Sequence, residues 1–159
     1  MLYGGYSTIS LGYLGIYEMT KLMKGVSLTT LEGHDFSIKV MQYMNDKILK
    51  WRKETNIDFV LYAIPDKELC YNFAKIDKEK FGTIENITEK GYYTNSYHID
   101  SKEKIDIFEK LKIESEFQKL SGGGAISYVD ISSIKNDNNK LETLIKYVYN
   151  NIQYVEFKI

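Results

Sequence analysis

A short apolar run, FVLYA at residues 59–63, constrains the fold of this chain more than any other segment. Five consecutive apolar residues are typical of a strand that is buried on both faces of a parallel sheet. Pro65, the only proline in the chain, ends this strand, and a helix is expected to start at about Asp66. The segment therefore predicts a strand that passes directly into a helix, as in α/β proteins.

Apolar periodicity predicts two helices before this strand. The first is expected over residues 8–23, after a flexible start at Gly4 and Gly5, and it is apolar nearly all round, which favours burial on several sides. The second follows a loop at 26–33, has Asp35 near its N-cap and ends around Asn56. Its apolar stripe comprises Phe36, Val40, Met41, Met44, Ile48 and Trp51.

The rest of the chain predicts one more helix, a long connection, and a strand–helix–strand unit. The helix from Asp66 ends at 81–82, and its inward-facing residues are Leu69, Phe73 and Ile76. Residues 83–119 are expected to be mostly irregular, and connections of this length are often functional. A strand over 125–129, an amphipathic helix after Asp137 and a strand over 154–157 follow. This order predicts an α/β fold without an internal linker.

Charge and cysteine content exclude several classes of function. The formal net charge is −1, so composition does not suggest a nucleic acid or an anionic membrane as a partner. Cys70 is the single cysteine, so neither an intrachain disulfide nor a cysteine-based zinc site can form from this chain alone. His34 and His98 are far apart, and no metal site is expected. The chain shows no membrane span and no signal peptide, which predicts a cytoplasmic protein.

The turn AIPDKE at 63–68 is the first candidate binding site. A strand-to-helix junction presents free backbone N–H groups and the positive end of a helix dipole to an anion. The candidate phosphate contacts are Pro65, Asp66, Lys67 and Glu68. The alternative is an ordinary helix start with Asp66 as its N-cap, and these residues alone favour the cap.

A second candidate site lies in the long connection. Thr94, Asn95 and Ser96 are short hydrogen-bonding residues between Tyr93 and Tyr97. In a pocket they could bind ribose or phosphate oxygens. The alternative, which is more common, is a turn in which these side chains satisfy their own backbone.

The glycine run Gly122, Gly123 and Gly124 is the third candidate. It could form an anion-binding nest or let the backbone approach a ligand closely, whereas the alternative is a flexible turn before a strand. Cys70 is interpreted as a small buried thiol on the inner side of its helix rather than as a reactive group.

Several motifs together resemble one enzyme family. GYYTNSYH at 91–98 and EFQKLSGGGAISY at 116–128 resemble the C-terminal part of the catalytic barrel of anaerobic (class III) ribonucleoside-triphosphate reductase, a glycyl-radical enzyme. The resemblance also covers residues 3–18, 41–51 and 58–82, so it runs nearly from end to end.

The resemblance implies a fold and a reaction. The fold would be the C-terminal portion of a ten-stranded α/β barrel, with 94–96 near the active site and 122–124 facing the barrel interior. The parent enzyme is an oxidoreductase that reduces ribonucleoside triphosphates to 2′-deoxyribonucleotides by glycyl and thiyl radical chemistry. This chain would supply barrel wall and substrate-pocket loops.

The turn at 63–68 departs from the family pattern. In that family it contacts substrate phosphates, and Pro65 and Leu69 match its usual sequence. Ile64, however, replaces a hydroxyl residue, while Asp66 and Glu68 add negative charge where a triphosphate would lie.

The resemblance further implies that residues 1–159 are a single fragment of the barrel. The ATP-cone, the loop with the thiyl cysteine, the four-cysteine zinc module and the glycyl-radical loop would all lie outside it, and no Arg-Thr-Cys-Gly-Tyr type motif is present. No catalytic residue is therefore expected here. The parent's glycyl radical, structural zinc and ATP or dNTP effectors would belong to other segments.

Partners follow from the same resemblance. They are a ribonucleoside triphosphate, the remainder of the reductase chain or a complementary fragment, and, through the full enzyme, an activase that uses S-adenosylmethionine and an iron–sulfur cluster. The fragment is expected to be inactive alone and, because barrel strands would leave open edges, to self-associate. The alternative is a non-catalytic scaffold or inactive remnant that completes a barrel in trans.

Overall fold

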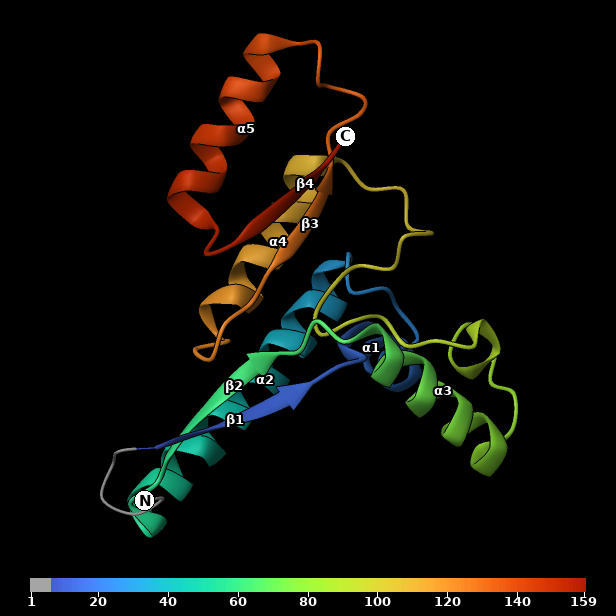
Figure 1. Ribbon diagram of the computed structural model, residues 1–159. Helices are drawn as coiled ribbons and strands as arrows, with labels where there is room; N and C mark the ends of the chain where they lie inside the picture. The colour runs from blue at the N-terminus through green and yellow to red at the C-terminus, as the bar shows by residue number, and fades with distance from the viewer. Residues whose placement is uncertain (1–6) are drawn as a thin grey trace.

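The computed structural model describes residues 7–159, which form two parallel two-stranded sheets with helices packed against them (Figure 1). The predicted α/β fold is confirmed, while Gly4 and Gly5 lie outside the described residues. The elements in order are β1 (Thr8–Tyr13), α1 (Ile16–Lys24), α2 (Leu31–Thr55), β2 (Asp58–Ala63), α3 (Lys67–Phe81), a 3-10 turn η1 (Thr88–Lys90), α4 (Ile107–Lys119), β3 (Ser127–Asp130), α5 (Asn138–Asn151) and β4 (Val155–Lys158).

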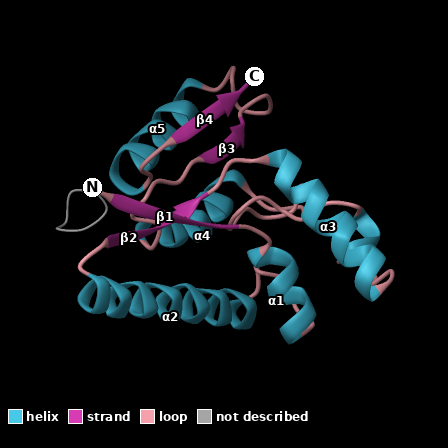
Figure 2. Ribbon diagram, turned by 60° about the horizontal axis from the view of Figure 1, so that its bottom comes forward, coloured by secondary structure: helices cyan, strands magenta, loops and turns pink. Residues whose placement is uncertain are grey.

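The first sheet contains the strand that the sequence predicts most strongly. β2 pairs in parallel with β1, from Thr8 opposite Asp58 to Tyr13 opposite Ala63. α2 lies along this pair and covers one face, as Figure 2 shows. Leu61 and Ala63 are buried, whereas the residues between them are only partly buried. Full burial on both faces was therefore predicted wrongly, because helices of the described chain pack on one face of β2.

The N-terminal helix predicted over 8–23 is wrong in its first half, where β1 lies. Ile9, Leu11 and Tyr13 alternate with more exposed residues, which is the period of a strand. Gly15 adopts a left-handed conformation (φ 75°) that separates β1 from α1. Because β1 and α1 are both apolar, their combined sequence resembles a single buried helix.

α2 starts four residues before the predicted N-cap at Asp35. Thr30 is the N-cap, and its Oγ1 accepts a hydrogen bond from the Gly33 N–H at 3.1 Å. The predicted end is confirmed, because Asn56 closes the helix in a left-handed conformation. Of the predicted stripe, Met41 and Ile48 are buried, while Trp51 is 42% exposed.

α3 begins and ends as predicted but presents a different face. Asp66 is its N-cap and accepts from the Leu69 N–H at 3.1 Å. The buried residues are Cys70 and Ala74, whereas the predicted inward residues Phe73 and Ile76 are exposed. Small side chains let the helix approach the connection that follows it, where the Tyr93 N–H donates to the Cys70 carbonyl at 3.1 Å.

The prediction that 83–119 is mostly irregular missed α4. Asp106 caps this helix by accepting from the Phe108 N–H at 2.8 Å. Its buried face mixes Leu111 and Phe117 with Glu114 and Gln118, so its apolar periodicity is weak. Residues 83–106 are irregular apart from η1.

The second sheet pairs β3 with β4 in parallel, and α5 connects the two strands. The helix that the sequence predicts after Asp137 is confirmed, with Asp137 as its N-cap, and Leu144 packs with Leu111, Val129 and Ile134 in a core of its own. β3 begins two residues later and β4 one residue later than predicted.

The glycine run joins the two sheets. The Gly123 N–H donates to the Leu61 carbonyl at 2.7 Å, and the Ala63 N–H donates to the Gly124 carbonyl at 3.0 Å. A Cβ on Gly123 would lie 2.8 Å from the Leu61 carbonyl oxygen, so only glycine fits there. The chain just before β3 is therefore attached to β2, while β1–β2 and β3–β4 remain two separate sheets.

We expect Gly123→Ala to lower the free energy of unfolding by about 2 kcal/mol, because the added methyl group forces the glycine run away from β2. Gly122→Ala is the matched control, since a Cβ there meets nothing within 4 Å, and it should be neutral or slightly stabilising. Urea unfolding followed by circular dichroism measures both. Equal effects of the two substitutions would contradict the close pairing.

Candidate functional site

Part of each of two predicted segments lines one cavity of about 340 Å³, which we call the two-lysine cavity. It lies between the start of α3, the connection 92–101, α4 and β3. Lys67 and Asn95 line it together with Lys110. Its remaining walls include the Asp100 carboxylate and five aromatic side chains, Tyr71, Tyr92, Tyr93, His98 and Tyr128.

The predicted segment 94–96 has mainly structural contacts. Thr94 is buried and donates to Glu18 Oε1 through its N–H at 2.9 Å and its Oγ1 at 2.6 Å. Ser96 is 1% exposed, has a φ of 47° and donates through Oγ to the Ile64 carbonyl at 2.9 Å. Thr94 and Ser96 thus fix the loop, and Thr94 and Asn95 are the members that line the cavity.

The carbonyls of the same segment hold the start of α1. The Gly15 N–H donates to the Thr94 carbonyl at 2.9 Å, and the Ile16 N–H donates to the Ser96 carbonyl at 3.1 Å. Helix starts leave N–H groups without intrahelical partners. The loop therefore satisfies two such groups and locks α1 against the cavity wall.

In the turn after β2, one residue caps α3 and another brings a positive charge to the cavity. Pro65, Asp66 and Glu68 are exposed, and Asp66 acts as the N-cap of α3. Lys67 is the member of the turn that lines the two-lysine cavity.

The glycine run does not line this cavity. Gly123 and Gly124 pair with β2, and Gly122 is exposed. Their close backbone approach is to a strand of the same chain.

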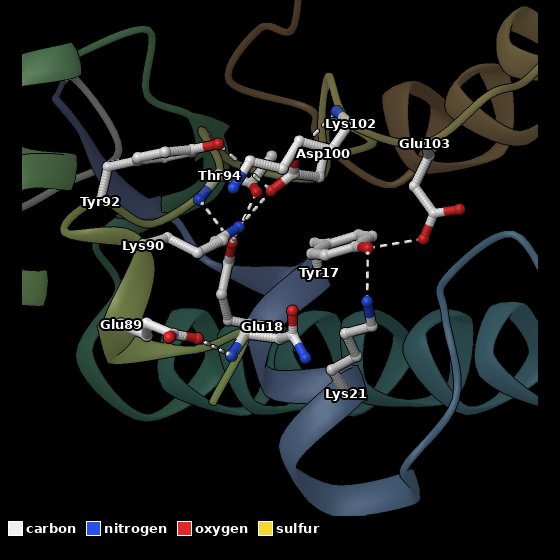
Figure 3. Close-up of polar contacts among 11 residues, drawn as sticks. Tyr17, Glu18, Lys21, Glu89, Lys90, Tyr92, Thr94, Asp100, Lys102 and Glu103 are labelled. Carbon is white, nitrogen blue, oxygen red and sulfur yellow. Dashed lines mark hydrogen bonds and ion pairs between the residues drawn. The ribbon is translucent and has the colours of Figure 1, made fainter. Parts of the chain in front are cut away.

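A buried ionic cluster that the sequence did not reveal holds the site together (Figure 3). Lys90 Nζ donates to Glu18 Oε1 at 2.5 Å and to Asp100 Oδ2. The side chain of Lys90 is 6% exposed, and each carboxylate side chain is 3% exposed. The Lys90 ammonium group also lies over the rings of Tyr92 and Tyr17, 4.7 and 5.1 Å from their centroids.

The pKa values of Lys90 and Asp100 favour their charged forms. Burial would lower the pKa of Lys90, but hydrogen bonds to Asp100 and Glu18 outweigh it and raise that pKa. Burial would raise the pKa of Asp100, but Lys90 and the Lys102 backbone N–H, which donates at 2.9 Å, lower it. Lys90 and Asp100 therefore stay ionised at neutral pH.

A series of side-chain hydrogen bonds extends the cluster along α1. The Tyr17 hydroxyl donates to Glu103 Oε1 at 2.5 Å and accepts from Lys21 Nζ at 3.0 Å (Figure 3). Burial and then the Glu103 carboxylate raise the pKa of Tyr17. The connection is thus attached to α1 at Glu18 and again at Tyr17.

Cys70 is the small buried thiol that the sequence predicts. It is 3% exposed, and burial, followed by the charges of Glu18 and Asp66, raises its thiol pKa. A raised pKa disfavours the nucleophilic thiolate.

His98 is a partly buried residue that the sequence analysis considered only as a metal ligand. Its Nε2 lies 2.7 Å from the Ile126 carbonyl oxygen, and a carbonyl can only accept, so Nε2 carries the proton. Burial lowers the pKa of His98 from its ordinary 6.5, against an opposing effect of Glu114. The ring packs between Tyr97 and Tyr128 and fixes the wall of the cavity.

Neither a metal centre nor a membrane segment is found in residues 7–159. No group of three or more His, Cys, Asp or Glu side chains in this range could hold a metal ion. In the same range, no helix is both long and apolar enough to cross a bilayer.

Comparisons with known proteins agree on one family. The family model described as anaerobic ribonucleoside-triphosphate reductase matches residues 2–159. The enzyme of that name from enterobacteria phage T4 is 37% identical over 150 residues, which are 94% of this chain and 23% of the relative. The one from Haemophilus influenzae is 36% identical over 152 residues, 94% of this chain and 22% of the relative.

Solved structures agree on the fold. The anaerobic ribonucleotide reductase from Thermotoga maritima in complex with dATP and CTP aligns with a TM-score of 0.77 at 19% identity, over 98% of this chain and 25% of that one. The chain thus spans about a quarter of the length of the proteins that it matches.

We expect Lys90→Met to lower the free energy of unfolding by about 3–5 kcal/mol at pH 7, because it leaves two buried carboxylates without their shared cation. Lys102→Met is the matched control, since Lys102 is exposed and contacts Asp100 through its backbone N–H. Its effect should stay within about 0.5 kcal/mol. Denaturant unfolding of both variants measures this, and similar losses would argue against the cluster.

We expect stability to fall as pH drops below the ordinary histidine pKa of 6.5, because the unfolded chain then binds a proton at His98 that the folded chain resists. The loss is complete once pH passes below the lowered pKa of the folded state. In His98→Gln this slope should flatten, and in His34→Gln, which leaves His98 in place, it should persist. Unfolding titrations between pH 7.5 and 5 test this, and an unchanged slope in His98→Gln would contradict the buried neutral ring.

Proposed function

The chain belongs to the anaerobic ribonucleoside-triphosphate reductase family, and we propose that it forms part of the catalytic α/β barrel of such an enzyme. The observation that supports this is the order of strands. β1 pairs with β2, the glycine run just before β3 pairs with β2, and β3 pairs with β4; both strand pairs are parallel. Such pairing of successive parallel strands, with helices packed against them, is what a barrel wall requires.

We propose that the two-lysine cavity contributes to binding of a ribonucleoside triphosphate. Lys67, at the start of α3, Thr94 and Asn95 line the cavity. We take Lys67 and Asn95 as the direct contacts, because the Thr94 N–H and Oγ1 already donate to Glu18. Ser96 holds the loop through the Ile64 carbonyl. Parallel strands bind ligands at their carboxyl ends, which is where Lys67 follows β2.

The remaining predicted residues shape the surroundings of that cavity. Pro65, Asp66 and Glu68 form the turn that sets the position of α3. The residues at 122–124 keep β3 next to β2. Their proposed contribution to substrate binding is therefore the placement of the walls.

Radical chemistry would have to come from other segments. The resident groups that the family implies include a four-cysteine zinc site, and this chain has a single cysteine, so its residues do not fit that site. Cys70 is buried and its thiol pKa is raised, so it does not fit the role of a reactive thiol either. The proposed contribution of this chain is part of the barrel wall and part of the substrate pocket.

A second candidate function is a non-catalytic scaffold that completes a barrel in trans. It is favoured by the strand edges, since β1 and β4 each pair with one strand among the described residues. Phe157 and Ile159, at the β4 end, are exposed. A complementary segment could pair with these edges without any nucleotide bound.

We expect CTP or ATP to raise the melting temperature of the purified chain in a saturable way, because a ligand that binds only the folded state stabilises it. Lys67→Ala should weaken the affinity about tenfold, which corresponds to one charge-assisted hydrogen bond. Lys75→Ala, on the exposed part of the same helix, is the matched control and should bind like the original chain.

Inorganic tripolyphosphate separates phosphate binding from recognition of the whole nucleotide. A cooperatively folded sample that no nucleotide stabilises would rule out the pocket and leave the scaffold as the better description.

A further inference from the structure

A cavity of about 640 Å³ lies between α1 and α3, and Tyr93 lines both it and the two-lysine cavity. The two helices follow β1 and β2, and both extend beyond the carboxyl ends of these strands (Figure 2). Met19 and Leu22 of α1 line one side, and Leu69 and Phe73 of α3 line the other. We call this space the α1–α3 groove, because Leu22 and Phe73 are 58% and 47% exposed and its walls therefore reach solvent.

The apolar strip of α3 is largely uncovered by the described residues. Leu69, Phe73 and Ile76 follow one another at helical spacing, and the sequence predicts that they face inward. In the structure Phe73 and Ile76 are exposed, and the buried residues of α3 are Cys70 and Ala74. Side chains three and four positions apart share one face of a helix, so the three larger residues form a single strip that lies largely open.

α1 presents a second apolar strip to the same groove. Leu22 and Met23, in its last turn, are exposed, and Met19, one turn earlier, is partly buried. All three line the groove, as Leu69 and Phe73 do from α3. An amphipathic helix binds to such a surface by placing apolar side chains at positions i, i+3, i+4 and i+7 into a hydrophobic groove.

The length of α3 gives a physical reason for a covering element. α3 has 15 residues, and helices of this length are marginal in water unless an apolar face packs against other parts of the protein. Its two buried side chains are small, so most of its apolar surface stays in water in the described chain. A helix laid over the groove removes that surface, and the surface of Leu22 and Met23, from water.

The carboxylates at the groove already have partners. Glu18 accepts from Lys90 and Thr94, and Asp77 accepts from the Tyr93 hydroxyl at 2.7 Å. The groove therefore recognises its occupant mainly through apolar contact, which suits a helix face better than a small polar ligand.

The family comparison indicates where a covering helix comes from. The matched region is 94% of this chain but 23% of the phage T4 relative, so most of that reductase consists of segments outside the matched region. Such segments are the candidates for the helix.

We propose that the α1–α3 groove is the binding site of an amphipathic helix from another part of the reductase polypeptide. The helix packs its apolar stripe between Leu22 of α1 and Phe73 of α3. This inference rests on the proposed function, because it takes the chain to be part of a larger catalytic barrel. It adds a contact that is separate from the strand edges of β1 and β4, since it uses the side chains of two helices.

Peptides from the phage T4 relative test the proposal. Overlapping labelled peptides of about 20 residues, which cover the part of that protein outside the matched region, are titrated with the chain and followed by fluorescence anisotropy. We expect saturable binding, with a dissociation constant below about 100 μM, of a peptide with apolar residues at helical spacing, and loss of binding when a central proline breaks its helix. If no peptide binds, or if the proline version binds equally well, the proposal is wrong.

Two substitutions locate the bound peptide. Phe73→Ser and Leu22→Ser should each weaken its binding at least about tenfold, and because both residues are exposed, the circular dichroism spectrum and the unfolding midpoint should stay unchanged. Tyr149→Ser, which changes an 88% exposed aromatic residue on α5, is the matched control and should bind like the original chain. Unchanged binding in either groove variant would contradict a site between the two helices.

Sedimentation velocity distinguishes a second copy of the chain from the proposed helix. Self-association that disappears in Phe73→Ser and Leu22→Ser but persists in Tyr149→Ser would mean that a second copy occupies the groove, which would overturn the proposal. Stabilisation by CTP should be the same in Phe73→Ser as in the original chain. A chain that CTP stabilises but that binds no peptide contradicts this inference alone, whereas a chain that binds the peptide but not CTP contradicts the nucleotide site alone.

Discussion

The buried ion pairs of Lys90 are the constraint on which the rest of this structure depends. Residues 83–106 form a long connection with a single 3-10 turn, so neither a helix nor a strand holds its path. Lys90 ties this connection to Glu18 of α1 and to Asp100 further along the connection itself. Burying three charges is costly unless their hydrogen bonds are nearly complete. Glu18 Oε1 and Asp100 meet that condition, whereas Glu18 Oε2 has no hydrogen-bond donor among the described residues.

Two cavities lie on the two sides of the segment that Lys90 fixes. The two-lysine cavity has Lys67, Lys110 and Asp100 at its walls, and the larger, mostly apolar α1–α3 groove of about 640 Å³ has Glu18 and Asp77. Tyr93 lines both, so one tyrosine separates them. The short distance between them means that a change in the path of residues 92–94 alters both cavities together.

The sequence predicted the features that depend on neighbouring residues. Asp66 and Asp137 are caps because their carboxylates reach N–H groups three residues ahead, and such pairs are readable from the chain. Residues that meet over long separations were not readable: Lys90 and Glu18 are 72 positions apart. The requirement for glycine at position 123 was not readable either, because it arises from contact with β2 and not from the local turn. β1 was not predicted because its alternating pattern is short and the strand is followed almost directly by an apolar helix.

The charges of the two-lysine cavity decide what this chain can contribute to a nucleotide. Lys110 Nζ already forms an ion pair with Glu114, 2.9 Å from Oε1, and donates a hydrogen bond to the Tyr128 carbonyl at 2.7 Å, so its charge is largely engaged. Asp66 and Glu68 flank Lys67 with negative charge. One lysine is a weak site for a triphosphate, whereas the tyrosine rings offer faces on which a base or ribose can pack. In the proposed nucleotide site, the contribution of these residues would therefore be to pack against the nucleoside rather than to neutralise the phosphates.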